Sequence, residues 1–160
     1  MSEGVARELV QSLIDSLVDP TTESLVLVPA ERPACLHVYA GEHAGKRGWT
    51  ASLDCRRMMS HLLRAIVANS GDGRCAVSWR AHNVDRVTIS TSSPALMRRV
   101  LDVVIADHRR TCPDARLAAI VLGSDGCAPR RIDVVRPPAR RASTAPRRPA
   151  LALVSSHSPA

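Results

Sequence analysis

The spacing of apolar residues predicts three amphipathic helices in this chain. In the first, over residues 3–18, leucine, valine and isoleucine recur every three or four positions. The second, over residues 55–69, has a similar apolar stripe and follows Asp54, whose carboxylate suits a helix N-cap. The third begins at Ser93-Pro94, a capping residue followed by a proline in the first turn. Each helix therefore has one apolar face that must pack against another element.

Six segments have the alternation or the continuous apolar character of β-strands. They are residues 24–28, 35–39, 49–53, 74–80, 86–91 and 117–122. The fourth and fifth segments predict a hairpin in which Cys75, Val77 and Trp79 face the core. The order of elements is then helix, three strands, helix, two strands, helix, strand. We expect an α+β fold, a single small domain with three helices on a mostly antiparallel sheet.

Charge is distributed very unevenly along the chain. Residues 128–160 hold seven arginines and one acid, a net charge of 7 − 1 = +6, which leaves +1 of the total +7 for residues 1–127. The same segment contains six of the 11 prolines. Segments with low hydrophobicity and high net charge do not bury enough apolar surface to fold. We therefore expect a globular domain over residues 1–127 and a disordered, Arg/Pro-rich tail over residues 128–160.

This tail has the character of a polyanion-binding segment. Spaced arginines neutralise phosphate groups and release counterions, which gives salt-sensitive binding. The candidate contacts are Arg130, Arg131, Arg136, Arg140, Arg141, Arg147 and Arg148. We expect the partner to be nucleic acid, with an acidic protein as the alternative. A membrane is not expected, because the tail lacks an aromatic or amphipathic anchor.

The tail also contains a candidate phosphorylation site. Arg140-Arg141-Ala142-Ser143 resembles the substrate motif of basophilic protein kinases, with two arginines before the serine. A phosphate on Ser143 would add about two negative charges and weaken polyanion binding.

A second group of basic residues lies within the predicted domain. Its members are Arg57, His61 and Arg64 on the second helix, and Arg74, Arg80 and Arg86 on the outer side of the hairpin. Together they would form a secondary basic face. Sheets that bind nucleic acids usually stack bases on exposed aromatic side chains, however, and Trp79 is expected in the core. A solvated surface is the simpler interpretation.

The sequence predicts no enzyme, no cofactor and no metal site. Cys35 and His37 share one side of a strand, but the spacing typical of zinc ligands is absent. The chain also lacks a Gly-rich phosphate loop, a Gly-x-Ser-x-Gly elbow and a paired-carboxylate signature. His61 with Cys55 or Cys112 is the base–nucleophile pair that we consider. We expect a binding protein without catalytic activity.

The cysteines and the hydropathy indicate a reducing compartment. Five scattered cysteines argue against a disulfide framework. The chain has no apolar run near the ~20 residues that span a bilayer, and its N-terminus has no signal-peptide pattern. We therefore expect a cytoplasmic or nuclear protein that is not secreted.

The order of elements through residue 111 resembles the type III secretion chaperone-like fold. Leu62-Leu63-Arg64-Ala65, then Asn69, a glycine turn, a hairpin and a closing helix, is similar to the central stretch of that family. The resemblance implies a homodimeric adaptor that holds partner segments on its sheet, without a cofactor. With that adaptor function, the tail would be a regulated linear motif.

A second fold remains open at this point. Residues 48–122 also fit a ferredoxin-like β-α-β-β-α-β core, a topology that dimeric viral origin-binding domains use. Arg56 and Arg57 would then begin a candidate recognition helix. Both folds imply self-association, and we expect a homo-oligomer.

Overall fold

A computed structural model describes residues 3–30, 35–43, 45–124 and 126–135. The elements are α1 (Glu3–Val18), β1 (Thr22–Pro29), β2 (Leu36–His43), β3 (Lys46–Arg56), α2 (Arg57–Ser70), β4 (Gly73–Ala81), β5 (Val84–Thr91), α3 (Pro94–Thr111), β6 (Leu117–Gly123) and β7 (Arg130–Val135). The first nine elements follow the predicted order. The α+β class, with three helices and an antiparallel sheet in a single small domain, is confirmed.

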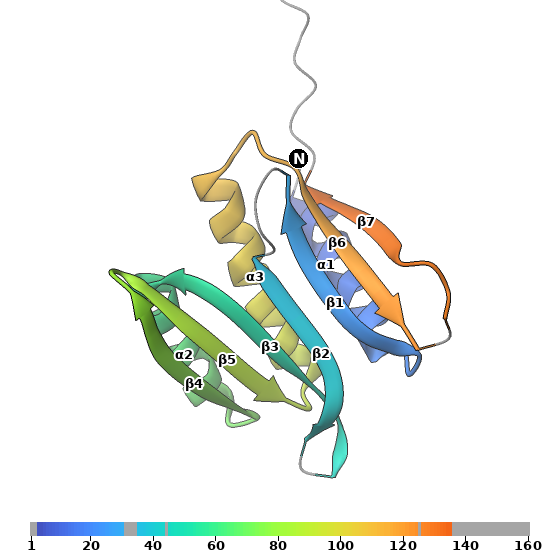
Figure 1. Cartoon of the computed structure of the whole chain (residues 1–160), viewed down its shortest axis with the longest axis horizontal. Helices are drawn as coiled ribbons and strands as arrows, with labels where there is room; N and C mark the ends of the chain where they lie inside the picture. Colours follow the sequence, from blue (N-terminus) through green and yellow to red (C-terminus); the bar gives the residue numbers. More distant parts are fainter. Residues whose placement is uncertain (1–2, 31–34, 44, 125, 136–160) are drawn as a thin grey trace, which may run out of the picture.

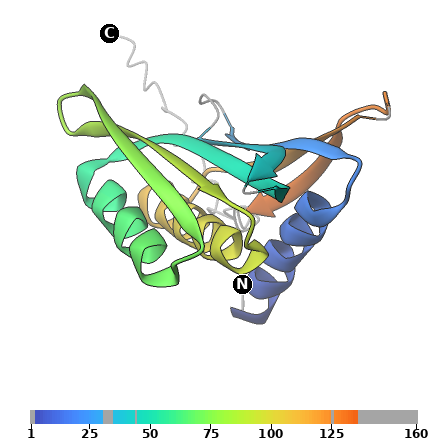
Figure 2. The same cartoon turned by 90° about the horizontal axis from the view of Figure 1, so that it is seen from below.

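All seven strands belong to one antiparallel sheet with the order β4-β5-β3-β2-β1-β6-β7. The three helices lie on one side of this sheet (Figure 1), and a view turned by 90° places all of them beneath it (Figure 2). We call the other side of the sheet the open face, because no helix of the described residues covers it. β2 is the middle strand and runs along the centre of the open face.

The core fills the space between the helices and the helix-facing side of the sheet. Trp49, Ala51 and Leu53 of β3 are buried on that side, in the alternation predicted from the sequence. The indole N–H of Trp49 donates a 3.0 Å hydrogen bond to the carbonyl oxygen of Leu17, which fastens the end of α1 to β3. Aliphatic side chains make up most of the remaining core, as expected for a chain without phenylalanine.

α3 follows the sequence prediction closely. The Ser93 hydroxyl accepts a hydrogen bond from the backbone N–H of Leu96, and Pro94 occupies the first turn. Its apolar face, Met97, Val100, Leu101 and Val104, is buried, as expected for an amphipathic helix.

The start of α2 differs from the prediction. The helix begins at Arg57, and its N-cap is Arg56, which has no side-chain capping hydrogen bond. The prediction that Asp54 caps this helix is wrong, because the ladder between β3 and β5 continues to the pair Arg56–Val84. Backbone pairing keeps Asp54 extended, and its side chain pairs with Arg86.

The folded part of the chain extends beyond the predicted boundary at residue 127. Arg130–Val135 forms β7, which pairs with β6 at one edge of the sheet. Val134 and Val135 are buried, and Arg130 donates a 2.6 Å hydrogen bond to the Ser16 hydroxyl. The assignment of residues 130–135 to a disordered tail is therefore wrong, since apolar residues here complete the core over α1. The remaining tail residues, 136–160, lie outside the described residues.

The sheet order also excludes the ferredoxin-like alternative. That core would place the first and last of its four strands side by side. Here these strands correspond to β3 and β6, and β2 and β1 lie between them. Instead, the N-terminal strands β2 and β1 extend the sheet beyond β3, and β6 pairs with β1.

Candidate interaction surfaces

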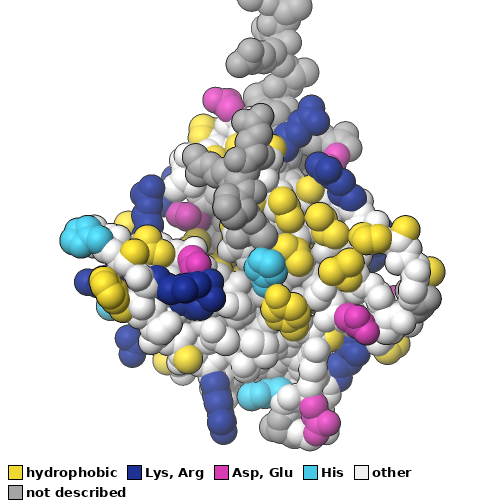
Figure 3. Space-filling model, in the orientation of Figure 1, with side chains coloured by type: hydrophobic (Ala, Val, Ile, Leu, Met, Phe, Trp, Pro, Cys, Tyr) yellow, Lys and Arg dark blue, Asp and Glu magenta, His cyan; other side chains and the backbone are white. Residues whose placement is uncertain are grey.

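The middle of the open face carries a cluster of apolar side chains from β1, β2 and β6. Val26 lies opposite His37 on one side and Ile120 on the other, and Ser24 lies between Tyr39 and Leu122 in the same way. We define the central patch as Val26, Val28, Tyr39, Ile120 and Leu122. Hydrophobic side chains gather over these strands in the space-filling view (Figure 3). Tyr39 is 50% exposed although it lies on the central strand.

Tyr39 has a fixed neighbour on its own strand. Its ring stacks on that of His37, with ring centroids 6.1 Å apart and planes inclined by 16°. The Tyr39 hydroxyl also lies 3.3 Å from His37 Nδ1, at hydrogen-bonding distance. The pair thus presents a flat, preorganised aromatic surface at the middle of the open face.

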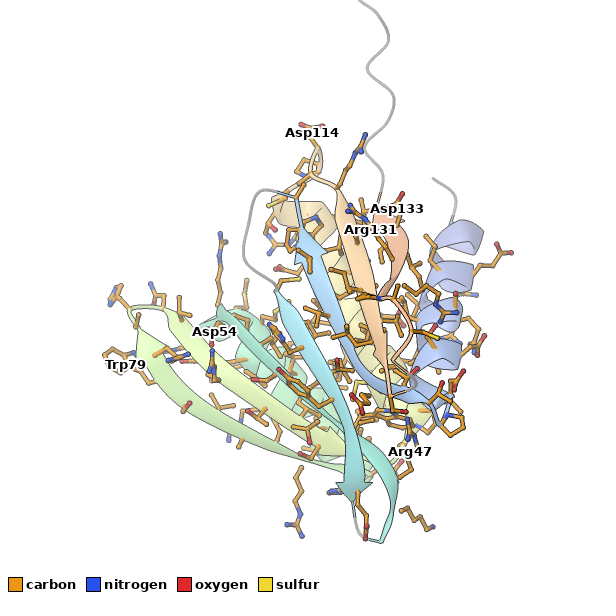
Figure 4. All side chains as sticks on the ribbon, turned by 45° about the vertical axis from the view of Figure 1, so that its right-hand side comes forward. Arg47, Asp54, Trp79, Asp114, Arg131 and Asp133 are labelled. Carbon is orange, nitrogen blue, oxygen red and sulfur yellow. The ribbon has the colours of Figure 1, made fainter. Side chains whose placement is uncertain are left out.

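Oppositely charged residues border the central patch on both sides (Figure 4). On one border Asp54 accepts two hydrogen bonds from Arg86, at 2.8 Å from Nε and 2.9 Å from Nη2, and Arg80 lies 3.6 Å away. These bonds, chiefly the one from Arg86, lower the pKa of Asp54 below its usual value. On the other border Arg131 lies 3.6 Å from Asp133. Two groups of paired charges therefore flank the apolar centre of the open face.

The six residues of the predicted secondary basic face do not come together. Arg74, Arg80 and Arg86 alternate with the core-facing residues of the hairpin and lie on the open face. The other three, Arg57, His61 and Arg64, are exposed on α2, on the opposite side of the sheet. The hypothesis of one continuous basic surface is wrong, because the sheet itself separates the two groups.

Trp79 corrects another prediction. It lies on the helix-facing side of β4 with Cys75 and Val77, as the alternation predicts, but it is 68% exposed and not in the core. Along β4 the exposure rises from the half-buried Cys75 to Val77 and then Trp79. β4 is an edge strand that α2 covers only in part, so Trp79 extends past the helix.

The structure separates His61 from the two cysteines that were considered as its nucleophilic partners. Cys35, Cys55 and Cys112 line one pocket of about 440 Å³ with His108, whereas His61 is not among its lining residues. Burial raises the pKa of Cys35 to about 11 and that of Cys55 to about 12. Both thiols are therefore protonated at neutral pH and are poor nucleophiles. Among the residues that the structure describes, no three His, Cys, Asp or Glu side chains are placed to hold a metal ion.

Comparison of the chain with protein-family models, with curated proteins and with solved structures finds no match. The resemblance to the type III secretion chaperone-like fold remains a prediction for this reason. Of the helices in the described ranges, none is both long and apolar enough to cross a bilayer.

Proposed function

We propose that this protein is a non-enzymatic adaptor that binds an apolar surface of a partner protein on its open face. The observation that carries this proposal is the central patch on β2, β1 and β6, in which Tyr39 and Leu122 are exposed and Val26, Val28 and Ile120 are half-buried. Contiguous apolar surface of this kind is typical of interaction sites. The stacked Tyr39–His37 pair adds a rigid aromatic contact at the centre, where interfaces gain most of their affinity.

The charges around the central patch favour a protein over a nucleic acid at this face. Nucleic acids require cations that are free to neutralise phosphates. Asp54 already pairs with Arg86 and Arg80, and Arg131 lies close to Asp133. A largely neutral, apolar partner surface therefore fits this face better than a polyanion does.

A second contact, through the C-terminal segment, is proposed on the basis of charge. Residues 136–160 contain five arginines and no acid. These arginines are Arg136, Arg140, Arg141, Arg147 and Arg148. The other two predicted contacts, Arg130 and Arg131, belong to β7. We propose that this segment binds nucleic acid electrostatically, and that phosphorylation of Ser143 would weaken the contact.

Self-association through the β4 edge is proposed for the expected homo-oligomer. Edge strands expose unpaired backbone groups that pair readily with another chain. If two copies of β4 pair antiparallel about Ser78, Val77 of each copy lies opposite Trp79 of the other. This pairing would cover two exposed apolar side chains in each copy. We therefore expect Trp79→Lys to shift the protein toward the monomer, as measured by analytical ultracentrifugation.

The open-face proposal is tested by affinity purification after nuclease treatment. The test variant, Tyr39→Glu with Leu122→Glu, places charges in the central patch. The matched control is Val18→Glu on α1, an apolar residue that is 47% exposed on the helix side of the molecule. We expect a partner that the wild type and the control retain and the test variant loses. The same partner, purified, should slow amide exchange in β1, β2 and β6.

Two results would contradict the adaptor function. One is that every retained partner disappears with nuclease treatment. The other is that the test variant and the control retain the same set of proteins, which would show that the central patch is not used.

A further inference from the structure

A second apolar surface lies on the opposite side of the sheet, between α2 and α3. It is a groove of about 530 Å³, and the first turns of α2 and the last turns of α3 form its walls. The apolar lining consists of Met58, Met59, Leu62, Val103 and Ala106. The groove shares no residue with the central patch, so it stands independently of the proposed function.

The groove exists because each helix has more apolar residues than the sheet can cover. The buried side of α2 consists of Ser60, Leu63, Ile66 and Val67. Met58 and Leu62 follow one another at i, i+4 on the neighbouring stripe, where they are 77% and 49% exposed. Across from them, the small side chain of Ala106 leaves room between the helices. Two apolar stripes therefore meet, and no third element of the described residues covers them.

Charges at the ends of the groove select the kind of ligand. Arg56 and Arg110 line it together with a single acid, Asp107, which pairs with Arg110 at 2.6 Å. The last turn of α3 is basic as a whole. The excess of positive charge disfavours the chain's own C-terminal segment, which has five arginines and no acid. It favours a ligand with acidic residues beside its apolar side chains.

We propose that this groove binds an amphipathic helix of a partner protein that carries acidic residues at the edges of its apolar stripe. Apolar side chains at i, i+3, i+4 and i+7 of such a helix match a groove between two helices. Methionines suit this role because their flexible, polarisable side chains adapt to the shape of the ligand. The acidic residues of the ligand contact Arg56 and Arg110.

The four methionines of the chain provide a direct measurement. The full chain is labelled with ¹³C at the methionine methyl groups and titrated with two synthetic helices of about 15 residues. Both peptides have leucines at i, i+3, i+4 and i+7. The residues beside the leucines are glutamates in one peptide (the glutamate helix) and lysines in the other (the lysine helix). We expect the glutamate helix to shift the signals of Met58 and Met59 but not that of the buried Met97. The lysine helix should bind at least about ten-fold more weakly.

Variants locate the binding in the groove. Leu62→Glu should weaken binding of the glutamate helix at least about ten-fold, whereas Val18→Glu should leave it unchanged. Arg56→Glu with Arg110→Glu should reverse the preference toward the lysine helix. Circular dichroism of each variant checks that the fold is retained.

Several outcomes would overturn the proposal. They are equal binding of the two helices, or unchanged Met58 and Met59 signals at millimolar peptide. Signals that depend on protein concentration without peptide would show that a second copy occupies the groove. Signals that move on removal of residues 136–160 would assign the groove to the chain's own C-terminal segment.

Discussion

The hydroxyl of Ser60 donates a 2.6 Å hydrogen bond to the carboxylate of Asp85 inside the core. Both residues are buried, and the bond joins α2 to β5. Asp85 lies at the end of an apolar row of β5 that continues with Val87 and Ile89. Burial of a carboxylate in this position costs free energy unless polar neighbours form hydrogen bonds with it.

Removal of this donor should destabilise the domain. We expect Ser60→Ala to lower the free energy of unfolding by about 1–3 kcal/mol, because the buried carboxylate of Asp85 loses a hydrogen bond. Urea denaturation followed by circular dichroism measures the change. Ser78→Ala, at an exposed position of β4, serves as the control. Equal stabilities of the two variants would show that the bond contributes nothing.

Gly41 and Gly48 are direct partners across β2 and β3, and they should respond differently to the same substitution. A Cβ at Gly48 would lie 2.7 Å from the Thr91 carbonyl oxygen and 2.9 Å from Cβ of His43, whereas a Cβ at Gly41 would meet nothing within 4 Å. We expect Gly48→Ala to cost about 1–3 kcal/mol of unfolding free energy. Gly41→Ala should change it by less than about 0.5 kcal/mol. Chemical denaturation of both variants tests this, and similar losses would contradict it.

Two truncations separate β7 from the cationic segment. A chain ending at Val135 should keep its fold and elute from a heparin column at lower salt than the full chain, because it lacks five arginines. A chain ending at Cys127 should lose about 3 kcal/mol or more, because Val134 and Val135 are no longer buried over the core. Thermal unfolding and the salt concentration at elution are the two measurements. If the chain ending at Val135 binds heparin as tightly as the full chain, the polyanion contact lies elsewhere.

The ion pair on the open face should be visible in the titration of Asp54. Its pKa lies below the usual 3.8, chiefly because Arg86 donates to its carboxylate. The pair therefore stabilises the fold fully at pH values above the usual pKa of 3.8. This contribution disappears as the pH falls through the lowered pKa of the folded state. Arg86→Gln should raise this pKa toward the usual value, as measured by the ¹³C shift of the carboxyl carbon. Arg80→Gln should have a smaller effect, because Arg80 lies 3.6 Å from the same oxygen.

The buried thiols should react slowly and make the fold sensitive to alkali. Burial raises the pKa of Cys55 from 9.0 to about 12. We expect iodoacetamide at pH 8 to modify the exposed Cys127 first and Cys55 last, as followed by peptide mass spectrometry. An unfolded thiol ionises near pH 9, so the thiol's contribution to stability is complete below pH 9 and is lost as the pH rises toward 12. Rapid alkylation of Cys55 in the folded protein would contradict this.

Several sequence predictions succeeded because local signals determine them. The capping serine and the following proline placed the start of α3 correctly at Ser93-Pro94. Period-two alternation placed Cys75, Val77 and Trp79 on one side of their strand, and the structure has all three on the helix-facing side of β4. These features depend only on neighbours in the chain, which the sequence displays directly.

Other predictions failed where a distant element decides the outcome. The alternation of β4 correctly assigned the side of Trp79 but not its burial, which depends on how far α2 reaches along an edge strand. Asp54 has the chemistry of an N-cap, yet pairing with β5 keeps it in a strand. Charge and proline content suggested that residues 130–135 belong to the tail. These residues instead pair with β6, which would otherwise be the edge strand of the sheet.

By itself, the sequence determined the helices, the first six strands, their order and the contrast between a nearly neutral domain and a cationic C-terminal segment. These follow from composition and from periodicity over a few residues. Only the tertiary structure decided the strand order, the central patch and the α2–α3 groove. Each of these brings together side chains from segments far apart in the chain, and such contacts depend on how the elements pack.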